Sequence, residues 1–149
     1  MTTLVIFDTN YGNTRILAER IAQQLGDARA LSVTDLSPSD LEGVDLLVAG
    51  SPIIGWKPSE RMQAFLSTLH EGSLTGVKAA AFDTRVRLFI HGDAARKISR
   101  ALSGAGAEIV ASPLGFIVAG TKGPLVEGEL ARAARWADTF LRKVAGSST

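Results

Sequence analysis

The chain has 149 residues, a formal net charge of +1 and a composition of 46% hydrophobic and 21% charged residues. These values suit one globular domain over residues 1–149, with residues 146–149 as a flexible tail. The absence of cysteine excludes disulfides, thiol catalysis and cysteine-ligated metal centres, and the two isolated histidines argue against another metal site. We expect a cytoplasmic protein, because no apolar run approaches the roughly 20 residues of a membrane span and the N-terminus lacks a signal-peptide pattern.

Strand and helix patterns alternate along the whole chain, as apolar runs and helical spacings of apolar residues follow one another. In chain order, we expect a strand at 4–7, a helix at 17–25, a strand at 28–33, a capped turn at 37–40, a strand at 44–49, a loop at 50–58, a helix at 62–69, a strand at 77–82, a loop at 83–92, a helix at 93–103, a strand at 107–120 interrupted at 112–113, and a helix at 130–144.

Five apolar strands that alternate with helices indicate an α/β fold of three layers. The strands form a doubly wound, five-stranded parallel sheet, and helices cover both of its faces. Ligands of such sheets bind beyond the carboxyl ends of the strands, where the strand order reverses. The loops after the first, third and fourth strands are therefore the candidate site.

The first of these loops, Thr-Asn-Tyr-Gly-Asn-Thr at 9–14, follows a strand and opens a helix. Gly12 permits a backbone conformation that other residues resist, and the neighbouring side chains are short hydrogen-bonding groups. A phosphate can be held here by backbone N–H groups and the helix dipole without a lysine. Neither usual nucleotide fingerprint, G-x-x-x-x-G-K-[ST] or G-x-G-x-x-G after a strand, is present. Taken alone, the loop fits a phosphate site and a plain polar helix cap equally well.

The second loop, residues 50–58, is stiffened by Pro52 and Pro58 and contains Trp56. A tryptophan in a surface loop can stack on an aromatic ligand or clamp the following helix. The third loop begins with Asp83-Thr84-Arg85 and continues to residue 92.

These three loops together resemble those of the flavodoxin family, and the likeness spans essentially the whole chain. The sequence T-x-x-G-N-T at 9–14 is similar to the family's FMN-phosphate loop, which usually reads S/T-x-T-G-x-T. Tyr11 replaces the central threonine, a variant that resembles flavodoxin modules of larger flavoproteins. The resemblance implies the sheet order 2-1-3-4-5, FMN as the cofactor and no catalytic side chain.

The resemblance also implies, position by position, which residues bind the cofactor. The expected residues are Thr9, Asn10, Tyr11, Gly12, Asn13 and Thr14 at the phosphate, Ser51, Pro52, Ile53, Ile54, Gly55 and Trp56 beside the isoalloxazine ring, and Asp83, Thr84 and Arg85 at its pyrimidine edge.

The function implied by the resemblance is electron transfer by an FMN-binding protein to redox partner proteins. Two alternatives stay open: an FMN-dependent oxidoreductase that acts on a quinone or porphyrinogen-type substrate, and a binding module of this fold that has lost flavin. Nucleic-acid binding is not favoured, because the basic residues are dispersed and not interleaved with aromatic residues.

The chain departs from the family pattern in charge, in its third loop and in its last connection. Residues 1–75 sum to −4 and residues 76–149 to +5, whereas flavodoxins are commonly acidic. The split fits a basic surface for an acidic partner, but ordinary solvated helix faces are the simpler interpretation. Tyr11 is the only tyrosine, so Phe89 is the candidate for the aromatic residue that flavodoxins often place over the ring. We interpret the extension at 121–125 as a simple turn.

Two arginines in the third loop suggest a hypothesis about the reduction potential. A cation near the pyrimidine edge stabilises a reduced, anionic flavin and raises its potential. Arg85 and Arg87 lie where the resemblance places that edge, and they are as compatible with solvent-facing positions.

Overall fold

The computed structural model describes residues 2–87 and 93–147. Its elements alternate along the chain as the hydrophobic pattern predicts. They are β1 (Thr3–Phe7), α1 (Asn13–Leu25), β2 (Ala28–Ser32), the 3₁₀ helix η1 (Pro38–Leu41), β3 (Leu46–Ile54), β4 (Lys57–Pro58), α2 (Glu60–Ser67), β5 (Lys78–Val86), α3 (Ala94–Gly104), β6 (Glu108–Ile109), β7 (Leu114–Val118) and α4 (Glu129–Ser147). In this described part of the chain, no helix is both long and apolar enough to cross a membrane.

The sheet has the predicted parallel order. It runs β2-β1-β3-β5, and β6 and β7 both pair with the far side of β5. Because β6 and β7 share the fifth position, the predicted interrupted strand is confirmed, with the break at Ser112-Pro113. β4 adds a short antiparallel hairpin to β3, which the sequence pattern did not predict.

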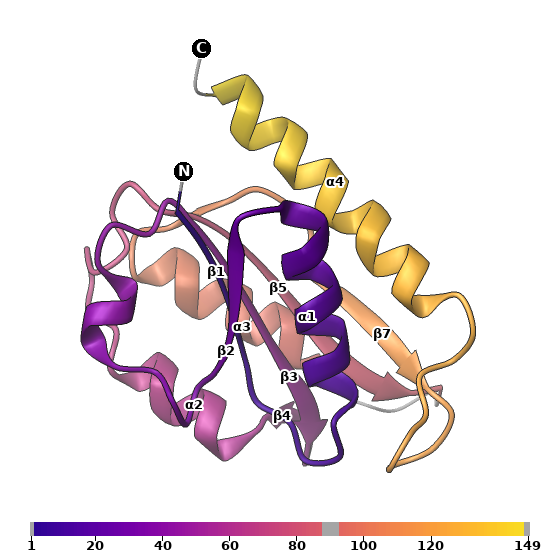
Figure 1. The fold of residues 1–149 in the computed structure, drawn as a ribbon. Helices are drawn as coiled ribbons and strands as arrows, with labels where there is room; N and C mark the ends of the chain where they lie inside the picture. The colour runs from indigo at the N-terminus through magenta and orange to yellow at the C-terminus, as the bar shows by residue number, and fades with distance from the viewer. Residues whose placement is uncertain (1, 88–92, 148–149) are drawn as a thin grey trace.

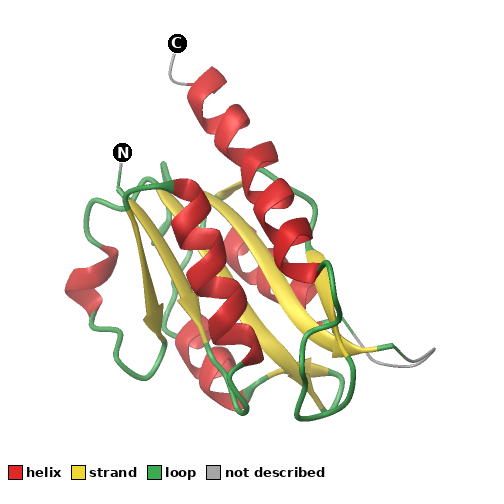
Figure 2. Cartoon of the chain, turned by 45° about the vertical axis from the view of Figure 1, so that its right-hand side comes forward, coloured by secondary structure: helices red, strands yellow, loops and turns green. Residues whose placement is uncertain are grey.

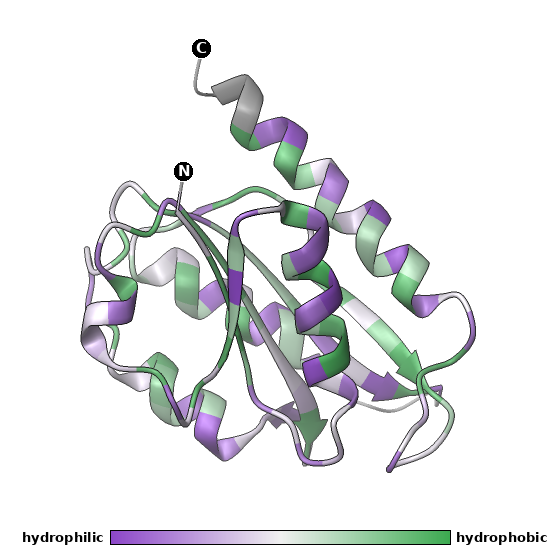
Figure 3. Cartoon of the chain, in the orientation of Figure 1, coloured by the Kyte–Doolittle hydropathy of each residue, from purple (hydrophilic) through white to green (hydrophobic). Residues whose placement is uncertain are grey.

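Helices cover both faces of the sheet, as expected for three layers (Figures 1 and 2). Successive residues of β1 alternate between two cores: Val5 and Phe7 pack with α1 and α4, whereas Leu4 and Ile6 pack with α2 and α3. The helices show green and purple stripes in Figure 3, because each presents one apolar face to the sheet. Because the main strands of the sheet pair in parallel, their carboxyl ends lie together at one edge of the molecule.

Two segments predicted as loops are extensions of strands. β3 continues through residues 51–54 and β5 through residues 83–86, because Ser51 and Pro52 pair with Asp83 and Thr84. The Gly50 carbonyl accepts the last hydrogen bond from the β1 side, from Asp8 N–H. The backbone nitrogen of Pro52, two residues later, faces the same side, but beyond the end of β1. No neighbouring strand requires its missing N–H. The loop prediction was wrong for these residues because pairing on neighbouring strands outweighs local turn preference.

The outer edge of β7 is closed by the chain that follows it. The Ile117 N–H donates to the Glu129 carboxylate at 2.7 Å, and its carbonyl accepts from Val126 N–H. Arg132 donates to the Gly115 carbonyl at 2.9 Å and lies over the Phe116 ring. Side chains and backbone around the start of α4 thus occupy hydrogen-bonding groups that an edge strand would otherwise leave free.

Candidate functional site

The loop after β1 leaves the N-terminus of α1 open to a ligand. Gly12 adopts a left-handed conformation (φ 93°) just before the helix, and its N–H donates to Thr9 Oγ1 at 2.8 Å. No described side chain caps this terminus, and the first turn of α1 contains no acidic residue. The first N–H groups of a helix have no partner within the helix and lie at the positive end of its dipole. This terminus is therefore suited to an anion.

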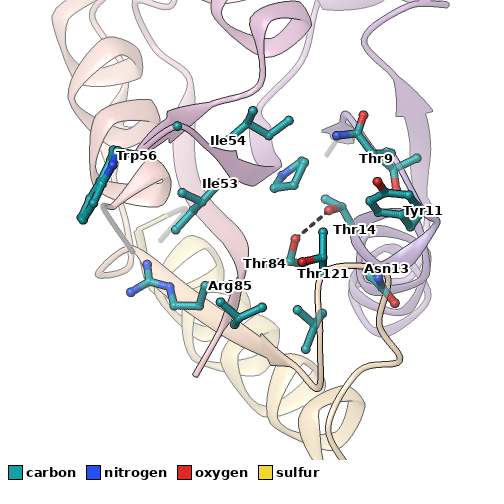
Figure 4. Close-up of a pocket in the computed structure, with 15 residues that line it drawn as sticks. Thr9, Tyr11, Asn13, Thr14, Ile53, Ile54, Trp56, Thr84, Arg85 and Thr121 are labelled. Atoms are coloured by element: carbon teal, nitrogen blue, oxygen red, sulfur yellow. Dashed lines mark hydrogen bonds between the residues drawn. The ribbon is translucent and has the colours of Figure 1, made fainter. Parts of the chain in front are cut away.

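A buried pair of hydroxyl groups joins this loop to the third predicted segment. Thr14 in α1 and Thr84 in β5 are almost fully buried, and their Oγ1 atoms lie 3.1 Å apart (Figure 4). The bond fixes the first turn of α1 against the carboxyl end of β5. The loop at 9–14 and the beginning of the third predicted loop therefore lie next to each other.

Arg61 of α2 holds the same loop from the opposite side. Its guanidinium donates to Asp8 Oδ1 at 2.8 Å, to the Thr9 carbonyl at 3.3 Å and to Asn10 Oδ1 at 3.0 Å. The Asp8 side chain is only 3% exposed, and its second oxygen has no hydrogen-bond partner within the described residues. Arg61 thus balances the charge of a buried carboxylate directly beneath the loop.

Replacing Arg61 with alanine is expected to lower the free energy of unfolding by about 1–2 kcal/mol, because Asp8 would be left without its counter-ion. The value lies below that of a fully buried pair because the Arg61 side chain is half exposed. Chemical denaturation of the flavin-free protein measures it. Arg15→Ala is the matched control, since the pair that Arg15 forms with Glu19 is exposed on both sides. Equal losses in the two variants would contradict the role given to Arg61.

The second predicted loop is the tip of the β3–β4 hairpin. Gly55 (φ 57°) and Trp56 (φ 72°) form its two-residue turn, and Trp56 is the only non-glycine residue with positive φ in the described chain. Two-residue hairpins favour positive φ at both positions, but normally with glycine or asparagine. Trp56 is 53% exposed, and Lys97 Nζ donates to its backbone carbonyl at 3.2 Å. A strained and exposed tryptophan marks this turn as a candidate ligand contact.

The third segment contains a buried ion pair. Arg85 donates to both oxygens of Asp83, from Nε at 2.8 Å and from Nη2 at 2.6 Å, and Asp83 is completely buried. The Ala95 N–H also donates to Asp83, and Asp93 lies 3.4 Å from Arg85. The hydrogen bond to Asp83 raises the pKa of Arg85 above its usual value. A side chain on Gly115 would overlap Arg85, so this glycine provides the room for the pair.

This pairing bears on the hypothesis for the reduction potential. Asp83 balances the charge of Arg85 at close range, so the field that reaches a ligand is weaker than that of a free arginine. Arg87 is exposed just after β5 and stays the candidate for that effect. Phe89 lies outside the described residues.

The connection between β7 and α4 also reaches the first loop. Asn13 Nδ2 donates to the Lys122 carbonyl at 3.2 Å, and Lys122 Nζ lies 6.0 Å from the centroid of the Tyr11 ring. Thr121 of the same connection points into the space beside Thr84 (Figure 4). Residues 121–125 were expected to form a simple turn, whereas Thr121 lines the cleft. The extra length and the lysine were visible in the sequence, but no spacing rule ties this connection to residues 9–14.

These elements enclose a cleft of about 350 Å³ at the carboxyl edge of the sheet. Most of the predicted residues line it: Thr9, Asn10, Tyr11, Asn13, Thr14, Pro52, Ile53, Ile54, Gly55, Trp56, Thr84 and Arg85. Gly12, Ser51 and Asp83 do not. Gly12 shapes the backbone, and the Ser51 hydroxyl accepts from Ser59 N–H at the start of α2. The wall is completed by three residues that were not predicted from the sequence: Val86, Val118 and Thr121.

Comparisons with known proteins agree with this geometry. The family model described as flavodoxin matches residues 5–136. An archaeal flavodoxin structure has a TM-score of 0.80 at 20% identity and covers 97% of this chain and 99% of its own. Oxidised Flavodoxin 1 from Bacillus cereus has a TM-score of 0.80 at 21% identity, with 95% and 98% covered.

A longer enzyme contains the same fold. Rubredoxin oxygen:oxidoreductase from Desulfovibrio gigas has a TM-score of 0.82 at 14% identity, over 99% of this chain but only 37% of that one. At these identities the structural matches establish the fold alone. The comparison with curated proteins gave no match.

Proposed function

This chain belongs to the flavodoxin family of FMN-binding electron-transfer proteins, and we propose that it binds FMN in the cleft at the carboxyl edge of its sheet. The observation that carries this proposal is that one cleft is lined both by the start of α1, whose N-terminus is uncapped, and by Trp56, which is exposed and has a strained backbone. One end of the cleft suits an anion and the other a flat aromatic ring.

The chemistry of the lining residues fits FMN. The N-terminus of α1 and the side chains of Thr9, Asn13 and Thr14 would hold the phosphate through neutral donors and the helix dipole. The hairpin tip at Gly55 and Trp56 would cover the ring, and Ile53 and Ile54 supply apolar surface beside it. A cleft of about 350 Å³ lies within the range of cofactor sites.

When bound, FMN would supply the redox chemistry, while the protein supplies binding and electrostatics. The described side chains at the cleft then have positioning roles. Thr84 and Thr14 hold the phosphate end in register with β5, and Arg61 neutralises Asp8 beneath it. We keep a cytoplasmic location as part of this proposal.

Titration of the purified flavin-free protein with FMN tests the proposal. We expect a micromolar or tighter dissociation constant, equivalent to about 8 kcal/mol or more, and a shift in the visible absorption of the flavin. Absence of binding would refute the proposal and favour a module that has lost flavin. Rapid turnover of quinones by the loaded protein would instead favour an enzyme over a carrier.

We further propose that its redox partners present acidic surfaces. Lys57 and Lys97 are exposed beside the hairpin tip, and neither forms an ion pair within residues 2–87 and 93–147. Lys97 is instead bound to the Trp56 carbonyl. Cations at the rim of a redox site attract acidic proteins and orient them toward it.

Charge reversal at both lysines tests the choice of partner. Lys57→Glu with Lys97→Glu is expected to slow electron exchange with a small acidic redox protein by about tenfold or more at low salt, with convergence at high salt. Stopped-flow absorbance measures the rate. Lys143→Glu is the control, because Lys143 is exposed in the last two turns of α4. This end of α4 projects away from the carboxyl ends of the strands (Figure 1). The same slowing in Lys143→Glu, or faster exchange in the double variant, would contradict the proposal.

A further inference from the structure

The connection between β7 and α4 is built as a structured wall of the cleft. Its ends are tied together by Ala119 N–H to the Pro124 carbonyl at 2.8 Å and by a bridge between Val118 and Leu125. Within it, Gly123 N–H donates to the Gly120 carbonyl at 2.9 Å. These backbone bonds fix residues 121 and 122 at the tip.

The tip is fitted to the first loop. Asn13 Nδ2 donates to the Lys122 carbonyl, and a Cβ on Gly123 would lie only 2.5 Å from Asn13 Oδ1. Gly123 also has positive φ (100°), so both its conformation and its small size are required there. Asn13 is the first residue of α1, so the contact joins the connection to the helix N-terminus that faces the cleft.

The cations around this terminus differ in their partners. Arg15 pairs with Glu19 at 3.3 Å, and Arg61 pairs with Asp8 at 2.8 Å. Lys122 pairs with no carboxylate in the described part of the chain, and its ammonium lies 6.0 Å from the Tyr11 ring centroid. Tyr11 and Thr121 both line the cleft. Lys122 itself is exposed, but its carbonyl is bonded to Asn13 at the start of α1 and its ammonium lies beside Tyr11, so an uncompensated positive charge stands at the rim of the anion-binding end.

We propose that Lys122 is a specificity residue that favours flavin carrying a terminal phosphate over flavin without one. The inference rests on the proposed FMN site and extends it to the last connection of the fold. The neutral donors of the first loop bind phosphate through directed hydrogen bonds, whereas the ammonium adds a longer-range attraction that a non-phosphorylated flavin does not receive. The Tyr11 ring attracts the Lys122 ammonium through a cation–π contact.

The test compares FMN with riboflavin in the full chain. Lys122→Gln is expected to raise the dissociation constant of FMN about threefold to tenfold at low ionic strength and to leave that of riboflavin unchanged. The dependence of FMN affinity on salt should become shallower, because one attractive charge has been removed. Lys122→Arg should restore the wild-type preference, and Lys143→Gln is the control for net charge.

Three outcomes would overturn the inference while leaving the FMN site intact. Unchanged FMN affinity in Lys122→Gln would show that the ammonium does not act on the phosphate. An equal loss for FMN and riboflavin would show that Lys122 only packs the wall. A loss that Lys143→Gln reproduces would show an effect of net charge alone. Failure of the wild-type chain to bind FMN would instead refute the proposed function.

Discussion

Replacing Arg85 with alanine is expected to lower the free energy of unfolding by about 3–5 kcal/mol, as is usual when one partner of a buried ion pair is removed. Asp83 is completely buried, and Arg85 contacts both of its oxygens, at 2.8 and 2.6 Å. In the variant, only the Ala95 N–H would remain as a hydrogen-bond donor to this carboxylate among the contacts described. Urea denaturation of the flavin-free protein, monitored by circular dichroism, measures the loss.

A double variant separates the stranded charge from lost packing. Asp83→Asn with Arg85→Met removes both charges, keeps an acceptor for Ala95 N–H and fills the space of the arginine stem. It should recover most of the stability, because a buried pair replaced by uncharged groups is often close to neutral. A loss below about 1 kcal/mol in Arg85→Ala would contradict the importance of the pair. A double variant as unstable as the single one would trace the effect to packing.

Replacing Trp56 with glycine is expected to have opposite effects on the flavin-free protein and on FMN binding. Trp56 has a left-handed backbone conformation that is unfavourable by about 1–2 kcal/mol for residues other than glycine, so the variant should be more stable by about 1 kcal/mol. FMN affinity should fall about tenfold to a hundredfold, because stacking on an aromatic side chain contributes about 1–3 kcal/mol. Denaturation and calorimetric titration measure the two effects.

Trp56→Phe is the matched control for this pair of effects. It keeps an aromatic ring and the strained backbone, so both stability and FMN affinity should stay close to wild type. The backbone bond from Lys97 is available in all three proteins, because it ends on the carbonyl of residue 56. Unchanged FMN affinity in Trp56→Gly would show that the tryptophan does not contact the ring.

The order of strands and helices could be predicted because each element carries its own periodic signal. The continuous apolar run at 4–7 identified β1 as a strand buried on both faces, and it is fully buried. The interrupted strand was predictable because a proline splits two apolar stretches, and β6 and β7 share one sheet position. Each of these features depends on residues that are close together in the sequence, so the sequence of one chain is enough to predict it.

Details of the site could not be predicted where they depend on partners that are distant in sequence. Asp83 was expected at the ligand, but its partner Arg85 and the space at Gly115 make it part of a buried pair. Arg61 and Lys122 contact the first loop across 51 and 109 residues of sequence, and local spacing cannot predict such contacts. The three loops could be predicted as one site because they follow the carboxyl ends of parallel strands, which a parallel sheet places together.

The closed edge of β7 has a consequence for how the protein meets other molecules. An exposed strand edge can recruit a strand from another chain and turn a brief encounter into a lasting assembly. Here the backbone of Ile117 is already satisfied by Glu129 and Val126, and Arg132 covers the Gly115 carbonyl. These groups of β7 are therefore not open to a strand from another protein. Such an edge suits a protein that exchanges electrons with a partner and then releases it.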